Sequence, residues 1–332
     1  MKRITTLLFG FAMMMVVMMP KGADAISISP PTFDFSLNPG DTVLDVIKIY
    51  NEEDTPITLY PFSQNFTNKE DEGGAPNFYE ADEVLNGREL SQWITYDEEP
   101  ISIGPGQRAN LSFAINIPED AQPGGHFGAI LLGTNPPAIE GGGVAVASQI
   151  TSLILVRVSG EVRELGQIAE FGFVDPQVSY NYLPVDFFMR FENYGNSHLR
   201  PVGNLFITNW RGKQVASIEI NNFIGSVLPQ SIRRFTFGWQ KSPVQDGWSE
   251  LQKEWHNFAV GKHTATLVLN YGQDNKIVTD VREFYVWPWR LLSIYGVLAV
   301  LVIVLIVLWK RRYDRVLFRR FERINKKRQN KN

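Results

Sequence analysis

The feature that most constrains this chain is an apolar run near its C-terminus, from Leu291 to Trp309. The run contains nineteen residues and no charged side chain. As a helix rising about 1.5 Å per residue it spans roughly 28 Å, close to the hydrocarbon thickness of a bilayer. A buried core helix would not need cations clustered at one end only. The run therefore predicts a single transmembrane helix over 289–310, with the lipid bilayer as a partner.

Tryptophans and cations flank this run. The candidate membrane-anchor residues are Trp287, Trp289, Trp309, Lys310, Arg311 and Arg312. Indole rings favour the headgroup layer, and the positive-inside rule places the cations in the cytoplasm. The tail over 311–332 is strongly basic, with eleven Lys and Arg against two acids from Lys310 onward. We expect this tail to be cytoplasmic and to lie beside anionic lipid.

The N-terminus predicts export. Lys2 and Arg3 precede an apolar stretch of about 13 residues, and Ala23 and Ala25 supply the small residues that signal peptidase requires. That stretch is shorter than the roughly 20 residues of a membrane span, which argues against an uncleaved anchor. Residues 1–25 are therefore predicted to be a signal peptide. The resulting localisation is the cell membrane, with one pass, extracytoplasmic N-terminal domains and a cytoplasmic C-terminus.

Charge and composition exclude several classes of function. Between Ile26 and Arg290 there are eighteen Lys and Arg against thirty-two acids, and an acidic body argues against nucleic-acid binding. The chain has no cysteine, which excludes thiol catalysis and Cys-ligated metal. It has no HExxH, GxSxG or phosphate-loop motif, and its four histidines lack metal-ligand spacing. We expect no enzyme activity, no cofactor and no metal site, with calcium at acidic turns as an alternative.

Strand patterns run through almost all of the exported part. Apolar residues alternate with other residues from Val43 to Tyr50, and short apolar runs bounded by Gly or Pro follow. Only two stretches, Asp82 to Trp93 and Ser249 to Phe258, favour short helices. The acidic stretch inside Asn65 to Gln92 predicts a solvated loop. The fold class is therefore all-β.

A repeated order of strands in the two halves of the chain predicts the number of domains. The strand that ends at Asn51, the strand Ala109 to Ile117 and the strand His126 to Leu132 recur in the same order in the second half. Their counterparts are Val185 to Asn193, Ile232 to Trp239 and Lys262 to Tyr271. Two tandem immunoglobulin-like β-sandwiches, over 26–165 and 166–288, account for this repeat. Chance recurrence of common turn residues is the alternative.

Two groups of residues are candidate binding sites. The polar cluster around Asn193, Tyr194, Asn196 and His198 is either a ligand-facing loop or a tight turn in which Gly195 or Asn196 takes a positive φ. Trp239, Trp248 and Trp255 either form a platform that stacks on glycan or belong to the core or a domain interface. His126 and His263 hold equivalent places in the two halves, which suggests a repeated structural role.

Two segments of the first half are similar to a known protein family. The start Ile28-Ser29-Pro30 through Phe35, with Leu37 to Asp41, and the segment Ile117 to Ile130 resemble the peptidoglycan-binding domain of the WxL-interacting protein family. The similarity in motif covers about 26–160, whereas the layout of the whole chain is similar. The resemblance implies a non-enzymatic bacterial surface protein that contacts cell wall and partner proteins. It adds Gly124, Gly125, His126 and Phe127 to the candidate binding residues.

Two hypotheses for function follow. The first is a surface binding or adhesion protein that engages cell-wall glycan (peptidoglycan) and other surface proteins. The alternative is a membrane-tethered assembly factor that captures a partner strand by β-augmentation along an exposed sheet edge.

Overall fold

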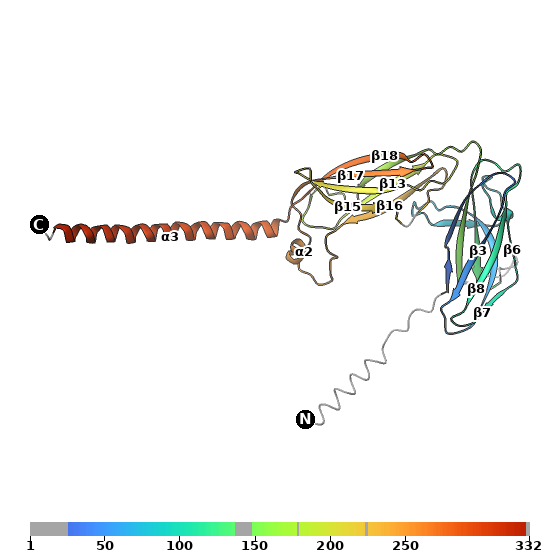
Figure 1. Cartoon of the computed structure of the whole chain (residues 1–332), viewed down its shortest axis with the longest axis horizontal. Coiled ribbons are helices and arrows are strands. Elements are labelled where there is room, and N and C mark those ends of the chain that lie inside the picture. Colours follow the sequence, from blue (N-terminus) through green and yellow to red (C-terminus); the bar gives the residue numbers. More distant parts are fainter. Residues whose placement is uncertain (1–25, 137–147, 178, 223–224, 330–332) are drawn as a thin grey trace, which may run out of the picture. The chain divides into compact units, whose positions relative to one another are not determined.

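The computed structural model describes residues 26–136, 148–177, 179–222 and 225–329, so the predicted signal peptide lies outside the described residues. Strands make up most of the part before Pro288, and one long helix follows it in the chain (Figure 1). The strands are β1 (Ile26–Ser29), β2 (Thr32–Leu37), β3 (Thr42–Asn51), β4 (Ile57–Asn68), β5 (Pro76–Tyr79), β6 (Ile94–Tyr96), β7 (Ile101–Ile103), β8 (Arg108–Asn116), β9 (Gly124–Gly133), β10 (Gln149–Val158), β11 (Gly166–Phe173), β12 (Ser179–Tyr180), β13 (Val185–Asn193), β14 (Val202–Asn209), β15 (Gln214–Ile220), β16 (Ser231–Trp239), β17 (Gly261–Tyr271) and β18 (Lys276–Val286). The helices are a 3-10 turn, η1 (Ser91–Trp93), α2 (Glu250–His256) and α3 (Trp289–Gln329).

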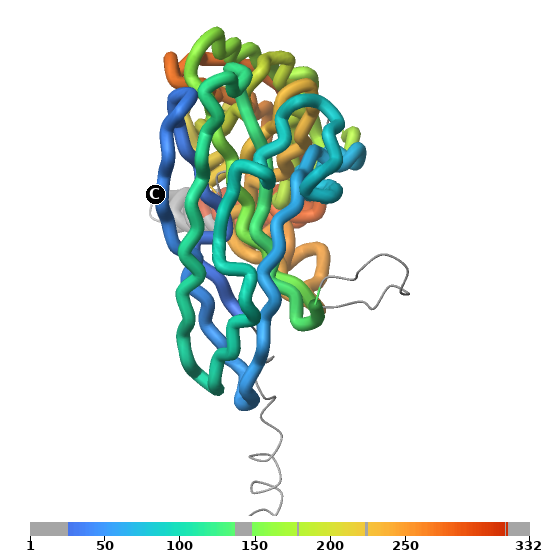
Figure 2. Tube along the Cα trace, turned by 90° about the vertical axis from the view of Figure 1, so that its right-hand side faces the viewer, coloured from blue at the N-terminus to red at the C-terminus, as the bar shows by residue number. Residues whose placement is uncertain are grey.

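The first ten strands form a β-sandwich. One sheet has the order β1-β3-β8-β6, and the other has the order β2-β10-β9-β4-β5, with β7 also paired to β4. In immunoglobulin nomenclature these orders are A-B-E-D and A′-G-F-C-C′. The blue to green strands lie side by side in Figure 2. Alternate residues of both sheets meet in a core that includes Ile47, Phe113, Ile130 and Val156, which replaces the missing disulfide with packing.

The last eight strands repeat this plan. They form a three-stranded sheet, β11-β13-β16, and a five-stranded sheet, β12-β18-β17-β14-β15. These orders correspond to A-B-E and A′-G-F-C-C′. In both sandwiches the A′ strand runs parallel to the last strand, β2 beside β10 and β12 beside β18. Aromatic rings fill the second core, where Phe187 contacts Phe173, Phe237 and Phe284.

The predicted fold class is therefore confirmed, and the repeated order of strands corresponds to topologically equivalent strands. β3, β8 and β9 of the first sandwich match β13, β16 and β17 of the second. By contacts the described chain separates into two compact units. Unit 1 contains Met1–Gly166 and two later segments, Glu192–Arg200 and Ser226–Arg233. Unit 2 contains Gln167–Phe191, Pro201–Gly225 and Arg234–Asn332.

Two local predictions need correction. The stretch from Asn65 is not simply a solvated loop, because β4 continues to Asn68 and pairs with β5. Asn65 itself is buried, and its side-chain oxygen accepts hydrogen bonds from the backbone N–H groups of Leu90 and Ser91. The helix predicted over Asp82 to Trp93 reduces to the 3-10 turn η1, since this segment closes over β4 instead of following a helical course. The predicted helix near Ser249 is present as α2, which begins with a capping box formed by Ser249 and Gln252.

The long helix α3 contains the predicted span. Residues Trp289–Arg315 have a mean hydropathy of 3.1 over their most apolar window, and only 6% of that window is buried. A helix this long and apolar, with its side chains exposed, has the length and composition of a membrane span.

Candidate functional site

Two buried asparagines occupy equivalent corners of the two sandwiches. Asn51 ends β3, and its Nδ2 donates to the carbonyl oxygens of Thr55, Ile103 and Gly104 at 2.9–3.2 Å. Asn193 ends β13, and its Nδ2 donates to the carbonyls of Ser197 and Val227, each at 2.8 Å. Each side-chain oxygen also accepts the N–H group two residues later. Asn193 is thus a corner clamp with its amide fully used, which leaves it no free polar atom for a ligand.

The loop after Asn193 packs onto other residues of unit 1. Asn196 accepts the Gly125 N–H at 2.8 Å through its carbonyl oxygen, and its side chain bonds the backbone of Glu161 and Arg163. Neither Gly195 nor Asn196 has a positive φ, so that part of the tight-turn prediction is wrong. Gly195 is needed for a different reason. A Cβ on it would lie 2.1 Å from the carbonyl oxygen of Arg163.

The same close approach explains the segment Pro123-Gly124-Gly125, whose two glycines begin β9. Gly124 has φ +122°, and a Cβ on it would lie 2.5 Å from the carbonyl oxygen of Asn196. Phe127 packs edge-on against His198, with ring centroids 5.8 Å apart. The structure therefore brings Gly124, Gly125 and Phe127 together with Asn196 and His198. Backbone and ring contacts within unit 1 occupy this cluster, which makes it a packing junction.

A charged network surrounds His198 at this junction. Its Nε2 lies 3.0 Å from Asp34 Oδ1, and Arg200 Nη2 lies 2.6 Å from the other oxygen of Asp34. Burial lowers the pKa of His198, so the ring is neutral near pH 7 and Nε2 donates. Burial by itself raises the pKa of Asp34, but the hydrogen bond from His198 and the guanidinium groups of Arg200 and Arg157 bring it below its usual value. Asp34 is thus an acceptor held ionised by its neighbours.

The predicted structural role of His126 and His263 fits their surroundings. Each is the third residue of its strand, β9 or β17, and each strand begins with a glycine of positive φ, Gly124 or Gly261. The ring centroids of His126 and Trp93 are 4.5 Å apart, and those of His263 and Trp239 are 5.1 Å apart. Each ring places one nitrogen 2.9–3.0 Å from a backbone carbonyl oxygen. Burial lowers the pKa of both rings.

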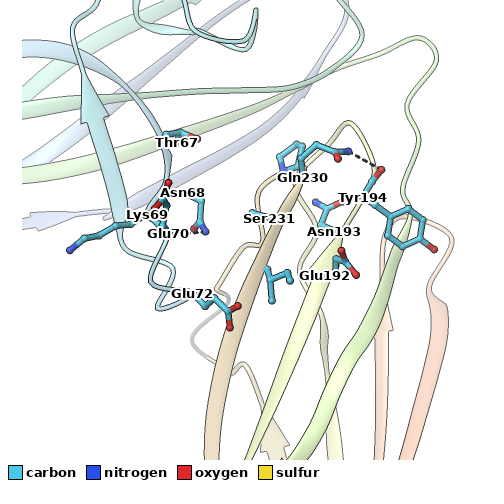
Figure 3. A pocket seen from close by; sticks show the side chains of 12 residues that line it. Thr67, Asn68, Lys69, Glu70, Glu72, Glu192, Asn193, Tyr194, Gln230 and Ser231 are labelled. Carbon is cyan, nitrogen blue, oxygen red and sulfur yellow. Dashed lines mark hydrogen bonds between the residues drawn. The ribbon is translucent and has the colours of Figure 1, made fainter.

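Beside the junction lies an open polar cavity of about 420 Å³ (Figure 3). Side chains of the β4–β5 hairpin, including Lys69, Glu70 and Glu72, line one part, and Tyr194 and Gln230 line another. Gln230 donates from Nε2 to the Tyr194 carbonyl at 3.0 Å, as the dashed line in Figure 3 marks. Tyr194 is half-exposed and is the candidate binding residue that faces solvent most openly. Among the described residues no group of three or more histidines and acids is placed to hold a metal ion.

The three tryptophans predicted as a glycan platform have separate roles. Trp239 is only 3% exposed and belongs to the core of the second sandwich, where it contacts Phe284. Trp248 stacks on His256 at 4.5 Å. Trp255 projects from α2 and is exposed. Because Trp239 is buried, it cannot stack on a sugar ring.

Sequence reasoning missed the charged residues that form the junction, Asp34, Arg157 and Arg200. Arg157 donates from Nε to Ser197 Oγ at 2.8 Å and from Nη2 to the His198 carbonyl at 3.2 Å. A signal was present in the sequence. Asp34 and Arg157 each interrupt an apolar strand, and a single charge there indicates a buried or half-buried partner.

Comparisons with known proteins leave the family open. No protein-family model matches the chain, and no curated protein matches it. Among solved structures, the chain is similar to the class 5 fimbriae chaperone CfaA, with 12% identity over 78% of this chain and 99% of that chain and a TM-score of 0.35. The YadV chaperone (10% identity, 78% and 99% coverage, TM-score 0.33) and the E. coli chaperone DraB (12%, 79% and 97%, TM-score 0.31) are similar to the same degree. At these values the similarities assign neither a family nor a function to this chain.

Proposed function

We propose that this chain is a non-enzymatic, membrane-anchored protein that binds an extended segment of a partner protein along β16, the last strand of the sheet β11-β13-β16. The export signal predicted over residues 1–25 and the apolar helix α3 support the anchoring. The cations at Lys310, Arg311 and Arg312 orient the chain, with the sandwiches outside the membrane and the C-terminus in the cytoplasm.

A comparison of β8 in the first sandwich with β16 in the second supports the binding proposal. In the first sandwich, β6 pairs with the outer side of β8, and Tyr96 lies opposite Phe113. In the second sandwich β16 is the counterpart of β8 and ends its sheet, and among the described residues no strand pairs with its outer side. β16 has nine residues and no proline, so its backbone geometry allows a further strand to pair beside it.

The exposure of the core phenylalanines on β8 and β16 differs accordingly. Phe113 on β8 is only 2% exposed, because β6 closes the sheet beside it. Phe237 on β16 points into the second core, where it contacts Phe171 and Phe187, yet it remains partly exposed. The first sandwich thus indicates what an added strand would do in the second. A strand added to β16 would cover Phe237 as β6 covers Phe113.

The side chains of β16 indicate which residues the partner segment should have. Side chains of a strand alternate between its two faces, so an added segment needs apolar residues at every second position to cover the core side. On the outer face Arg234 is exposed, and its guanidinium lies 4.1 Å from the centre of the Phe188 ring. We therefore expect an acidic residue on the outer face of the partner segment, opposite Arg234.

The glycan hypothesis has less support from the site. Its aromatic platform is not assembled, since Trp239 lies in the core and Trp248 packs on His256. The residues around Gly124 form the packing junction described above. Peptidoglycan binding, and with it the resemblance to WxL-interacting proteins, stays a prediction for which no contact surface has been identified.

Site-specific photocrosslinking in cells that produce the full-length chain tests the proposal. A photoreactive phenylalanine analogue replaces Arg234 or Thr236 on β16. In a matched control it replaces Ala114 on β8, which pairs with Thr95 of β6. We expect both β16 probes to crosslink to one partner at positions two residues apart, because residues i and i+2 of paired strands share a face. Crosslinks scattered over the partner's sequence, or equal crosslinking from position 114, would contradict strand addition at β16.

A further inference from the structure

Exposed tryptophans gather at one end of unit 2. Trp210, Trp255, Trp287 and Trp289 are 61%, 60%, 48% and 54% exposed. Large exposed aromatic side chains that cluster in this way usually mark an interaction surface. We call the end of unit 2 that carries these four residues the tryptophan pole.

Strand pairing places Trp210 and Trp287 at the same end of the second sandwich. Asn209 of β14 pairs with His263 of β17, and Gly261 of β17 pairs with Val286 of β18. Trp210 follows Asn209 directly, and a Cβ on Gly261 would lie 3.2 Å from Trp210 Cδ1. The ring therefore lies against the start of β17, beside the point where β18 leaves the sheet toward α3.

The turn that carries Trp210 is well ordered by its own hydrogen bonds. Asn209 Oδ1 accepts the N–H groups of Arg211 and Lys213 at 3.0–3.1 Å. The Arg211 guanidinium lies 4.4 Å from the centre of the Trp210 ring. This turn presents an indole ring together with two cations to solvent, a combination that suits the interface between phosphate groups and acyl chains.

A clamp between α2 and α3 places Trp255 at the same end. Glu254 is fully buried, and its Oε2 accepts the N–H group of Leu291 at 2.9 Å in the first turn of α3. Glu250 accepts a hydrogen bond from Arg290 at 3.1 Å. Trp255 is the next residue of α2, so its exposed ring lies beside the first turn of the apolar helix. In Figure 1 α2 lies next to the start of α3.

We propose that the tryptophan pole of the second sandwich rests in the headgroup layer of the membrane, with phospholipid as its partner. The inference rests on the membrane anchor of the proposed function. Trp289 begins the apolar helix, and Trp287, Trp210 and Trp255 lie at the same end of unit 2. A helix that enters the bilayer at Trp289 brings this end of the sandwich to the lipid surface. The sandwich then sits directly on the bilayer, and its height is set by the clamp at Glu254.

Lipid-borne quenching on the full-length chain tests this contact. The natural chain has no cysteine, so Trp210→Cys, Trp255→Cys and Trp289→Cys each create a unique thiol for a fluorescent label. Arg211→Cys gives a second probe of the turn that keeps Trp210. Ile277→Cys is the matched control, because Ile277 is an apolar residue that is 67% exposed at the opposite end of β18. At about 3.3 Å per residue, Ile277 lies roughly 30 Å along the strand from Val286.

The labelled proteins are reconstituted into phosphatidylcholine vesicles with and without bromine on the acyl chains near the headgroup. We expect labels at positions 210, 211 and 255 to lose fluorescence in brominated vesicles at least about half as strongly as the label at 289, and the label at 277 to be unaffected. Quenching at 289 with none at 210, 211 and 255 would overturn this inference and leave the membrane anchor standing. Absence of quenching at 289 would overturn the anchor and the inference together.

Discussion

Replacement of Asn51 by alanine should destabilise the first sandwich far more than an ordinary loss of one polar side chain. Asn51 is fully buried and joins the end of β3 to the turn at Thr55 and to the end of β7 at Ile103. Its amide has two hydrogens for three nearby carbonyls, and its oxygen accepts the Glu53 N–H at 3.0 Å. Alanine removes about three hydrogen bonds at once and fills none of the space.

The magnitude follows from those bonds. Each intramolecular hydrogen bond contributes about 1 kcal/mol net, and a buried partner left unsatisfied costs about 1–3 kcal/mol. Because the Ile103 carbonyl is buried while the others are partly buried, we expect a loss of roughly 3–5 kcal/mol in the free energy of unfolding of this sandwich. The control is Asn116→Ala on β8. Asn116 is exposed, and its bonds to Thr42 and Thr95 connect exposed side chains, so its loss should cost less than about 1 kcal/mol.

Amide hydrogen exchange of the full-length protein in detergent micelles measures the effect in each sandwich separately. A loss of about 3 kcal/mol corresponds to roughly 100-fold faster exchange of the slowest amides of β3 and β8. Asn193→Ala should have a comparable effect on β13, because the Asn193 amide donates to two backbone carbonyls and its oxygen accepts the Gly195 N–H. If Asn51→Ala accelerated exchange no more than Asn116→Ala, the corner-clamp argument would be refuted.

Three further predictions concern the junction and the anchor. Because burial lowers the pKa of His198, its contribution to stability should be complete above about pH 6.5 and decline as the pH falls below that value. After division by the intrinsic exchange rate at each pH, the protection factors of the amides in the loop of His198 should be lower at pH 5 than at pH 7.5, and His198→Gln should flatten this dependence. Gly124→Ala should destabilise unit 1 by at least about 2 kcal/mol more than Gly106→Ala in thermal unfolding, since both have positive φ but only Gly124 meets a backbone atom. Glu254→Ala should speed tryptic cleavage at Arg290 by about tenfold or more, whereas Glu254→Gln, which keeps an acceptor for the Leu291 N–H, should change it little.

Local patterns predicted much of the fold. Alternation identified β3 and β13, and turn residues identified the starts of β9 and β17. These features were visible because they depend on residues near one another in the chain. The matching order of strands then indicated two sandwiches of one plan, which the sheet orders confirm.

Features that depend on distant partners were not predictable in the same way. Trp239 and Trp255 were candidates for the same aromatic platform, yet one is a core residue and the other is exposed, because the assembly of the sheets decides which side chains are covered. Asn65 looks like the start of a solvated loop until the loop returns and its backbone bonds to the side chain. The terminal place of β16 in its sheet could not be predicted either, since nothing in its own sequence reveals whether a strand like β6 pairs with it.

The buried asparagines suggest how a β-sandwich fold without cysteine secures its corners. Asn51, Asn65, Asn193 and Asn257 are all buried, and each bonds two or more backbone groups of a returning segment. A disulfide stabilises mainly by restricting the unfolded chain, whereas an amide clamp acts only in the native state and only when its bonds are complete. Such clamps are insensitive to reduction, but each concentrates several bonds in one side chain. Single substitutions at these four positions should therefore be far more damaging than their size suggests, while exposed asparagines of the same strands tolerate change.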